Sequence, residues 1–378
     1  SCKPNGLSET DRRDFSGLET ALSAIFILSL LIGFCLQLIQ SVNNPYGQWD
    51  AWSFWNLRAG FIFAHFPDWL IAFDTNASNS NLDYPLLIPS LIFRMWTFVG
   101  SNSVVVPIGI GLLFTVSCVL VLVGGVWILN DKGTALIAGI CLITAKMFMV
   151  CGADQYSDVP LAFYFLSAIV LISVGTLYSL NNFSYLVMAG IMLGLASWTK
   201  NEGIMMAPVA LLSGFICLVV SHRKLSIYQA CFILIGFLPV FWVVADFKMN
   251  VAPHDNAFIT TGNLPRIWQQ IFQFDRYVII AKRFMLELFA FHRWGFVSLF
   301  LIFYAVFQGF RNEASLRPFS CLTLSAISLT LAGYFAIYVI TGQDLIVHLD
   351  TSLNRLIVHV FPAVLFLFFV NARGLHHD

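Results

Sequence analysis

Long runs of apolar residues, separated by short polar stretches, account for most of the chain. A helix that crosses the hydrocarbon core of a bilayer needs about 20 apolar residues. Ten runs come close to this length, at 20–41, 103–129, 133–151, 159–178, 184–200, 203–220, 226–246, 291–310, 319–341 and 355–371. The pattern therefore predicts an all-α polytopic membrane protein with about ten transmembrane helices.

One further apolar segment, 83–99, is predicted to lie along the membrane surface rather than across it. It contains two prolines and the central Arg94, and a spanning helix would bury that arginine at a cost of about 2.5–3.5 kcal/mol. Residues 51–66 have an aromatic-rich face beside charged side chains and form a second candidate. The stretch 42–102 is therefore predicted to be the first outer loop, with interfacial helices.

The distribution of basic residues orients the predicted helices. Short loops on the cytoplasmic side of membrane proteins carry an excess of lysine and arginine. With ten spans, the basic residues of the short loops fall on one side: Lys3, Arg12, Arg13, Lys132, the cluster 222–224, Arg311, Arg317 and Arg373. Both termini are therefore predicted to face the cytoplasm, and the segments 42–102, 152–158, 247–290 and 342–354 to face the opposite side.

The composition agrees with this organisation. The chain is 58% hydrophobic and 11% charged, whereas soluble domains carry about 25% charged residues. A net charge of zero gives no general argument for nucleic-acid binding. We expect a cytoplasmic head at 1–19, a transmembrane domain at 20–371 and a cytoplasmic tail at 372–378, with a second long outer loop at 247–290.

No cofactor is expected from the motifs. The eight cysteines are scattered, mostly inside apolar runs, and show neither metal-ligand nor disulfide spacing. The sequence has no phosphate-binding loop of the Gly-Lys-Ser/Thr type and no dinucleotide-binding fingerprint. A divalent metal between Asp50 and either Asp154 or Asp158 is the alternative, which we do not favour.

Asp50 lies among tryptophans just past the first apolar run, in the stretch from Gly47 to Trp55. An aromatic belt at the membrane surface and a helix-capping acid would explain this stretch without any chemistry. The other interpretation is that Asp50 is a reactive carboxylate. The further polar motifs on the same predicted side of the membrane favour this second interpretation.

Two further acidic motifs belong to that side. Asp154 and Asp158 would share one face if their stretch were helical. Two close carboxylates raise each other's proton affinity unless a cation or a hydroxyl-rich ligand lies between them, which makes them candidate sugar or cation ligands. Asp158 and Asp83 each precede an apolar run with a proline in its first turn, so helix capping is the alternative for both. Tyr84 is a candidate for stacking on a sugar.

Basic residues complete the set. Lys200 interrupts two apolar runs together with Asn201 and Glu202, and it either offers a point charge to a phosphate or extends to the membrane surface. Arg355 lies at the predicted start of the last span, where it either binds phosphate oxygens with its two-pronged guanidinium or anchors the helix. His359 follows one turn later and is alternatively a hydrogen-bonded core histidine. We predict phosphate binding by Lys200, Arg355 and His359, and substrate binding by Glu202.

Five motifs in this order resemble the C-type (GT-C) glycosyltransferases. They are Trp49-Asp50-Ala51-Trp52, Asp83-Tyr84-Pro85-Leu86-Leu87, Tyr156-Ser157-Asp158-Val159-Pro160-Leu161-Ala162, Trp198-Thr199-Lys200, and Arg355-Leu356 before Pro362. The branch that they resemble includes protein mannosyltransferases and bacterial lipid A aminoarabinose transferases. The resemblance extends over the whole predicted transmembrane domain.

The resemblance implies an enzyme that moves a sugar from a polyprenyl-phosphate donor to an acceptor hydroxyl at the outer membrane face, with inversion of the anomeric carbon. By this analogy Asp50 is the general base, a kind of group that accelerates reactions about 10²–10⁴-fold. Asp158, with Asp154, orients donor or acceptor, and Lys200 and Arg355 hold the departing phosphate. Relatives that transfer single sugars work without a metal, so none is expected.

The expected partners are the lipid-linked sugar, the bilayer, and a lipid, glycan or protein acceptor. The expected location is the bacterial inner membrane, with the active site on the periplasmic side. Two other functions remain. A lipid-linked-sugar transporter or flippase would carry polar residues across the membrane depth, and Lys146, inside the third apolar run, is the main residue of that kind. A non-catalytic scaffold subunit of a membrane assembly would keep the motifs without turnover.

Overall fold

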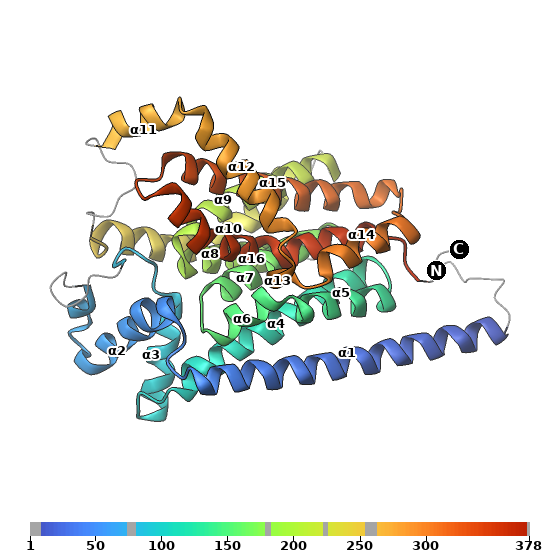
Figure 1. The fold of residues 1–378 in the computed structure, drawn as a ribbon, viewed down its shortest axis with the longest axis horizontal. Coiled ribbons are helices and arrows are strands. Elements are labelled where there is room, and N and C mark those ends of the chain that lie inside the picture. The colour runs from blue at the N-terminus through green and yellow to red at the C-terminus, as the bar shows by residue number, and fades with distance from the viewer. Residues whose placement is uncertain (1–8, 74–80, 178–182, 222–225, 254–262, 376–378) are drawn as a thin grey trace.

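The structure, a computed structural model, is built from helices throughout the residues that it describes, which are 9–73, 81–177, 183–221, 226–253 and 263–375 (Figure 1). The helices are α1 (Glu9–Asn43), η1 (Ala51–Trp55), α2 (Asn56–His65), η2 (Trp69–Phe73), α3 (Leu87–Val99), α4 (Val105–Leu129), α5 (Lys132–Thr144), α6 (Lys146–Ala153), α7 (Asp158–Leu177), α8 (Ser184–Thr199), α9 (Asn201–Ser221), α10 (Ser226–Asn250), α11 (Leu264–Ile271), α12 (Phe274–Leu288), α13 (Phe291–Trp294), α14 (Val297–Phe307), η5 (Ala314–Leu316), α15 (Arg317–Ile340) and α16 (Leu345–Asn371).

Seven helices in the described part of the chain are long and apolar enough to cross a membrane, or eight if α5 and α6 form one bent span. The chain is therefore an all-helical polytopic membrane protein. Two of the ten predicted spans are shorter helices, since α8 has 16 residues and α14 has 11. The run predicted at 291–310 is divided because Gly295, with φ of +61°, follows the four-residue α13.

Two predicted helix boundaries differ from the structure. The run predicted as one helix at 133–151 is bent by 62° between α5 and α6, with Ala145 in an extended conformation at the break. The last helix begins at Leu345 rather than at 355. Its start is fixed by Asp344, whose carboxylate accepts a hydrogen bond of 2.9 Å from the backbone N–H of Val347.

The basic short loops meet at one end of the bundle. Arg311 donates a hydrogen bond of 3.2 Å to the carbonyl of Leu129, and the side chain of Asn130 donates one of 2.7 Å to the carbonyl of Phe369. The first turns of α1 lie at this same end in Figure 1. Of the residues used to orient the chain, Lys3 and 222–224 lie outside the described residues.

The opposite end carries the first loop and the helices α2, α3 and α11 (Figure 1). The helix predicted at 51–66 is formed by η1 and α2, and the segment predicted at 83–99 forms α3. Arg94 in α3 is exposed, so its charge is not buried inside the bundle. Gly100, with φ of +76°, ends α3 in the left-handed conformation that glycine adopts without strain.

Glycines allow α8, α9 and α10 to approach closely. A Cβ added to Gly190 of α8 would lie 1.9 Å from the carbonyl oxygen of Ile233 in α10, so the two backbones are in direct contact there. A Cβ added to Gly203 would lie 1.9 Å from the carbonyl oxygen of Ala196. This second contact permits the sharp turn between α8 and α9, and the turn presents Lys200 and Glu202 to α7.

Candidate functional site

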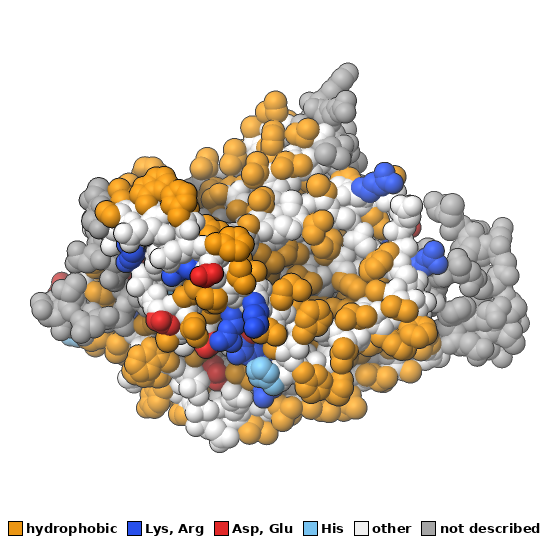
Figure 2. All heavy atoms as spheres, turned by 45° about the horizontal axis from the view of Figure 1, so that its top comes forward, with side chains coloured by type: hydrophobic (Ala, Val, Ile, Leu, Met, Phe, Trp, Pro, Cys, Tyr) orange, Lys and Arg blue, Asp and Glu red, His pale blue; other side chains and the backbone are white. Residues whose placement is uncertain are grey.

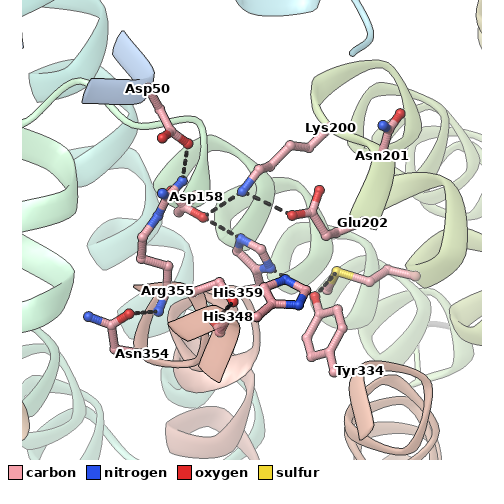
Figure 3. A network of polar contacts seen from close by, with 12 residues as sticks. Asp50, Asp158, Lys200, Asn201, Glu202, Tyr334, His348, Asn354, Arg355 and His359 are labelled. Atoms are coloured by element: carbon pink, nitrogen blue, oxygen red, sulfur yellow. Dashed lines mark hydrogen bonds and ion pairs between the residues drawn. The ribbon is translucent and has the colours of Figure 1, made fainter. Parts of the chain in front are cut away.

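Arg355 of α16 lies at the centre of a buried network of charged side chains (Figure 3). Its guanidinium contacts the carboxylate of Asp50, and it reaches Asp158 with Nη2 at 3.1 Å and Nε at 3.2 Å. The guanidinium carbon also lies 4.2 Å from the ring centroid of Tyr156. Arg355 thus joins three segments that are far apart in sequence, and a cation with such partners stays charged although it is largely buried.

Asp158 is the most enclosed member of the network, with no exposed surface. Besides Arg355, it accepts hydrogen bonds from Nζ of Lys200 at 2.9 Å and pairs with Nε2 of His359 at 2.7 Å. It is the first residue of α7, where the helix dipole also favours a negative charge. The alternative that Asp158 only caps a helix does not account for these three partners.

Asp50 precedes the π-helical turn η1, and its carboxylate makes no capping hydrogen bond there. Local π-helical turns are frequent at functional sites because they redirect side chains. The side chain of Asp50 keeps 12% of its surface exposed, and that of Arg355 keeps 16%. The network is therefore open to its surroundings on the side of this pair, while Asp158 closes the inner side.

Lys200 connects α8 and α9 and binds two carboxylates. Its ammonium group lies 2.9 Å from Asp158 and 3.1 Å from Oε1 of Glu202, and only 4% of the side chain is exposed. Burial opposes the charged form, but the two carboxylates together raise the pKa of Lys200 above its ordinary value. The other oxygen of Glu202, Oε2, is buried and has no hydrogen-bond partner among the described residues.

His359 is fully buried one helical turn after Arg355. Its Nε2 faces Asp158, and its Nδ1 lies 2.8 Å from the hydroxyl of Tyr334 in α15. Both ring nitrogens are thus engaged within the protein. Tyr334, which is buried as well, was not identified from the sequence, because a tyrosine inside an apolar run gives no signal that distinguishes it from other core residues.

Asp154 lies close to the network but has a partner of its own. Its Oδ1 accepts a hydrogen bond of 2.8 Å from the side chain of Gln40 in α1. The chain turns after α6 through Gln155, with φ of +59°, and a new helix begins at Asp158. The stretch is therefore not one helix, and the two carboxylates do not share the face that a continuous helix would have given them. Burial raises the pKa of Asp154, and the hydrogen bond from Gln40 partly opposes this effect.

Asp83 belongs to a second polar group beside the network. It accepts a hydrogen bond of 2.7 Å from Asn201 and lies 3.3 Å from Nζ of Lys248 in α10, while Lys248 also donates 2.7 Å to the side-chain oxygen of Asn201. Asn201 is adjacent to Lys200 and Glu202. These contacts fix the first loop to the turn between α8 and α9. Lys248, the cation of this group, was missed because it lies near the end of an apolar run, where lysine commonly extends to the membrane surface.

Tyr84 is held in the first loop by aromatic and backbone contacts. Its ring is stacked with Phe54 at a centroid distance of 6.0 Å and meets Trp55 edge-on at 5.5 Å. Arg58, which is buried in α2, donates a hydrogen bond of 3.2 Å to its carbonyl. Burial, together with the negative charges of Glu202 and Asp50, raises the pKa of the Tyr84 hydroxyl well above its ordinary value.

A cavity of about 410 Å³ lies beside α2, and its walls include Tyr46, Trp52, Asn56, His65 and Trp96. No charged member of the network lines it.

Within the described residues, no three His, Cys, Asp or Glu side chains are arranged to hold a metal ion. The carboxylates of Asp50 and Asp158 bind cationic side chains instead, so the residues present do not fit a metal centre.

Comparison with solved structures identifies the fold. The crystal structure of ArnT from Cupriavidus metallidurans bound to undecaprenyl phosphate aligns with a TM-score of 0.55 and 15% sequence identity, covering 93% of this chain and 60% of that one. The apo oligosaccharyltransferase of Archaeoglobus fulgidus aligns over 90% of this chain and 56% of that one, with a TM-score of 0.45 and 16% identity. No protein-family model and no curated protein sequence matches the chain.

The similarity to ArnT shows the fold. The predicted GT-C-like architecture is therefore confirmed, over a chain that spans 60% of the length of ArnT. At 15% identity the alignment carries no residue roles with it, so the chemistry of this chain has to be argued from its own network.

Proposed function

We propose that the protein is an inverting glycosyltransferase, which moves a sugar from a polyprenyl-phosphate donor to an acceptor hydroxyl. The observation that supports this most is the network itself. Two cations that can hold a phosphate, Lys200 and Arg355, lie within one cluster with Asp50, a carboxylate that keeps some exposed surface. The solved structure of similar fold, ArnT, contains bound undecaprenyl phosphate.

The charges of the network determine how a donor would bind. Three carboxylates, of Asp50, Asp158 and Glu202, meet two cations, of Lys200 and Arg355. A phosphate that entered without any rearrangement would add a further negative charge in a largely buried site, which is costly. We propose that Arg355 exchanges Asp50 for the donor phosphate. The exchange keeps the guanidinium paired and releases the carboxylate that has to act as a base.

The reaction then proceeds by direct displacement. Asp50 takes the proton of the acceptor hydroxyl, and the acceptor oxygen forms a bond to the anomeric carbon on the face opposite the phosphate. The bond from that carbon to the phosphate oxygen breaks, and its electron pair leaves with the polyprenyl phosphate. Arg355 and Lys200 meet the charge that develops on the leaving group. One displacement of this kind inverts the anomeric carbon.

Three of the remaining predicted site residues, Asp158, His359 and Glu202, have supporting roles in this proposal. Asp158 positions Lys200 and Arg355, since it contacts both and has no exposed surface. His359 positions Asp158 rather than binding phosphate, because both of its ring nitrogens have protein partners. Glu202 is the proposed sugar ligand, through the oxygen that lacks a partner among the described residues.

We further propose that α8 and the α13–α14 segment also cross the membrane, which gives ten spans with both termini in the cytoplasm. The charged network would then lie at the outer face, the periplasmic face if the membrane is a bacterial inner membrane. The fold class and the presence of several spanning helices support a multi-pass topology. The division into a head at 1–19, a tail at 372–378 and two outer loops remains a prediction from the sequence.

Transfer of radiolabelled sugar from a polyprenyl-phosphate donor in proteoliposomes tests the proposal. Asp50→Asn removes the base and should lower the rate about 10²–10⁴-fold. Asp68→Asn, an exposed acid of the same loop, is the matched control and should retain the wild-type rate. Full activity of Asp50→Asn would refute the role of Asp50. If the wild-type protein transferred no sugar from any donor to lipid, glycan or protein acceptors, the scaffold function would replace this proposal.

A further inference from the structure

A group of basic side chains lies on the outer surface of α12 and α13, next to the break between α5 and α6. Figure 2 shows lysine and arginine side chains gathered near the middle of this face, with hydrophobic side chains around them. The group, which we call the basic patch, consists of Lys146, Arg283, His292 and Arg293. None of these residues belongs to the network around Arg355.

Contacts between helices bring the patch together around the first part of α16. Arg283 of α12 lies 3.2 Å from the carboxylate of Asp350. One turn along α16, the side chain of Asn354 approaches the sulfur of Met147, the neighbour of Lys146, at 3.7 Å. Asn354 is also adjacent to Arg355 in sequence, so the patch borders the same helix that carries the centre of the network.

The short helix α13 closes the patch on its other side. Arg293 pairs with Glu287, which is in the last turn of α12, and Trp294 donates a hydrogen bond of 2.9 Å to the carbonyl of Glu287. The following Gly295 lies against the end of α5, since a Cβ placed there would be 3.6 Å from the carbonyl oxygen of Thr144. His292 and Lys146 therefore lie on the same part of the surface.

The patch holds more positive than negative charge. Its two carboxylates, Asp350 and Glu287, are each paired with an arginine. Lys146 and His292 are exposed and have no hydrogen-bond or ion-pair partner among the described residues. Lysine and histidine side chains in this position attract an anion, and phosphate is the anion that such groups commonly bind.

Large apolar side chains surround the patch. A water-soluble anion would need only the charged groups and would make no use of this apolar surface. Exposed hydrophobic side chains flank it on α12 and α14 and in the segment between them: Met285 58%, Leu286 57%, Phe289 59%, Phe291 52%, Phe296 72% and Leu299 57% exposed. A ligand that matches both features has an anionic headgroup and hydrocarbon chains. Lipid is the solvent of such a surface, so its source is the membrane.

The position of Lys146 also agrees with a headgroup site. The 13 residues of α5 extend about 20 Å from Lys132, which is two thirds of a hydrocarbon core of about 30 Å. The bend of 62° then places an exposed lysine at the break of a candidate span. A lysine at this depth extends its ammonium group toward the headgroup layer, and unpaired charges inside membrane spans commonly mark ligand sites.

We propose that the basic patch binds the phosphate headgroup of a membrane lipid, whose chains lie on the apolar surface of α12 and α14. This site does not depend on sugar transfer, and it adds a lipid contact on the surface of the helices that pack against α16. It assigns a ligand to Lys146, the residue that departs from the one-sided distribution of polar residues along the chain.

Native mass spectrometry of the detergent-purified protein tests the site. Phosphatidylglycerol should remain bound, whereas diacylglycerol with the same chains, which lacks the phosphate, should not. Lys146→Gln should raise the dissociation constant for phosphatidylglycerol, taken from the bound fraction over a lipid titration, about five-fold, as expected for the loss of one basic contact to an anionic lipid. Adding His292→Gln should raise it further. Lys146→Arg, which keeps the charge, should bind as the wild type does.

Lys132→Gln is the matched control, because it replaces the lysine that begins the other half of the same bent span. It should leave lipid binding unchanged. Equal binding of phosphatidylglycerol by the wild type and by the Lys146→Gln/His292→Gln variant would overturn the proposal. Displacement of the lipid by millimolar inorganic phosphate would also overturn it, because the patch would then be a site for free phosphate. Neither result depends on the rate of sugar transfer.

Discussion

Replacement of Asp158 by asparagine should destabilise the protein far more than the same replacement of Asp50. Asparagine has nearly the same shape, so the change removes the charge and leaves the volume. In the wild type Asp158 is shared by Lys200, Arg355 and His359. Asp158→Asn leaves two cations with one carboxylate each, Glu202 for the lysine and Asp50 for the arginine.

The magnitude follows from burial. The side chain of Asp158 has no exposed surface, that of Lys200 has 4% and that of Arg355 has 16%. Breaking a buried ion pair by removing one partner costs about 3–5 kcal/mol. Asp158→Asn breaks the pairs with both Lys200 and Arg355, but each cation keeps one carboxylate, so we expect a loss of about 3 kcal/mol. Among the described residues Asp50 forms an ion pair with Arg355 alone, its side chain keeps 12% exposure, and its loss leaves Arg355 paired with Asp158. For Asp50→Asn we therefore expect about 1 kcal/mol, as for a partly exposed pair.

Unfolding in mixed micelles with an increasing fraction of sodium dodecyl sulfate measures the difference. The double variant Asp158→Asn/Lys200→Met should not recover the loss, since removing Lys200 also takes away the cation that pairs with the buried carboxylate of Glu202. Equal stability of Asp158→Asn and Asp50→Asn would refute the reasoning. It would mean that the charge of Asp158 is compensated by something other than the two cations.

Two further predictions concern Asp154 and the contact between α8 and α10. Burial raises the folded-state pKa of Asp154 above its ordinary value. The contribution of Asp154 to stability is therefore greatest at low pH and is lost as the pH rises through the raised pKa. In thermal unfolding between pH 4 and 8, the wild type should lose stability relative to Asp154→Asn as the pH rises, and a gain in relative stability would contradict this prediction. Gly190→Ala should destabilise the protein by about 1–3 kcal/mol because its Cβ meets the carbonyl of Ile233. Gly124→Ala in α4, with open space around its Cβ, is the control and should be neutral or stabilise the protein by about 1 kcal/mol. Equal effects of the two variants in detergent unfolding would exclude the close contact as the cause.

The sequence was sufficient to predict that the charged site residues lie at one end of the bundle, because this placement depends on only two features. Apolar runs give the approximate spans, and short basic loops divide the remaining segments into two groups. Asp50, Asp158, Lys200 and Arg355 all fell into the same group. The structure brings these four side chains into one network through direct contacts. The division into two groups needs only the order of segments, and errors of a few residues at helix ends do not change it.

The partners within the network were not predictable in the same way. Asp154 and Asp158 lie four positions apart, and an unbroken helix would have paired them. The positive φ of Gln155 and the hydrogen bond from Gln40 separate them instead. Gln40 lies in another helix, so no local pattern contains this contact. The bend at Ala145 did have a local signal, because Lys146 interrupts an apolar run at that point.

The position of Arg355 relative to the carboxylates depends on where the last helix begins. The other charged members of the network lie at or next to the first residue of a helix: Asp50 before η1, Asp158 at the start of α7, and Lys200 and Glu202 around the start of α9. Carboxylates at helix starts are favoured by the dipole, and a sequence reading tends to treat them as caps. The start of the last span was predicted at Arg355 by the same reading, because apolar character increases there.

In the structure Asp344 caps α16, and Arg355 lies well inside the helix. A helix that begins this early carries Arg355 past the other helix ends, so its side chain approaches Asp50 and Asp158 from within the bundle (Figure 3). An arginine at the first turn of a helix would be free to turn toward water. Arg355 is instead held inside α16 and stacked on Tyr156. Among the described residues, the hydrogen-bond partners of its guanidinium are the carboxylates of Asp50 and Asp158, and the proposed exchange of one carboxylate for a phosphate requires this arrangement.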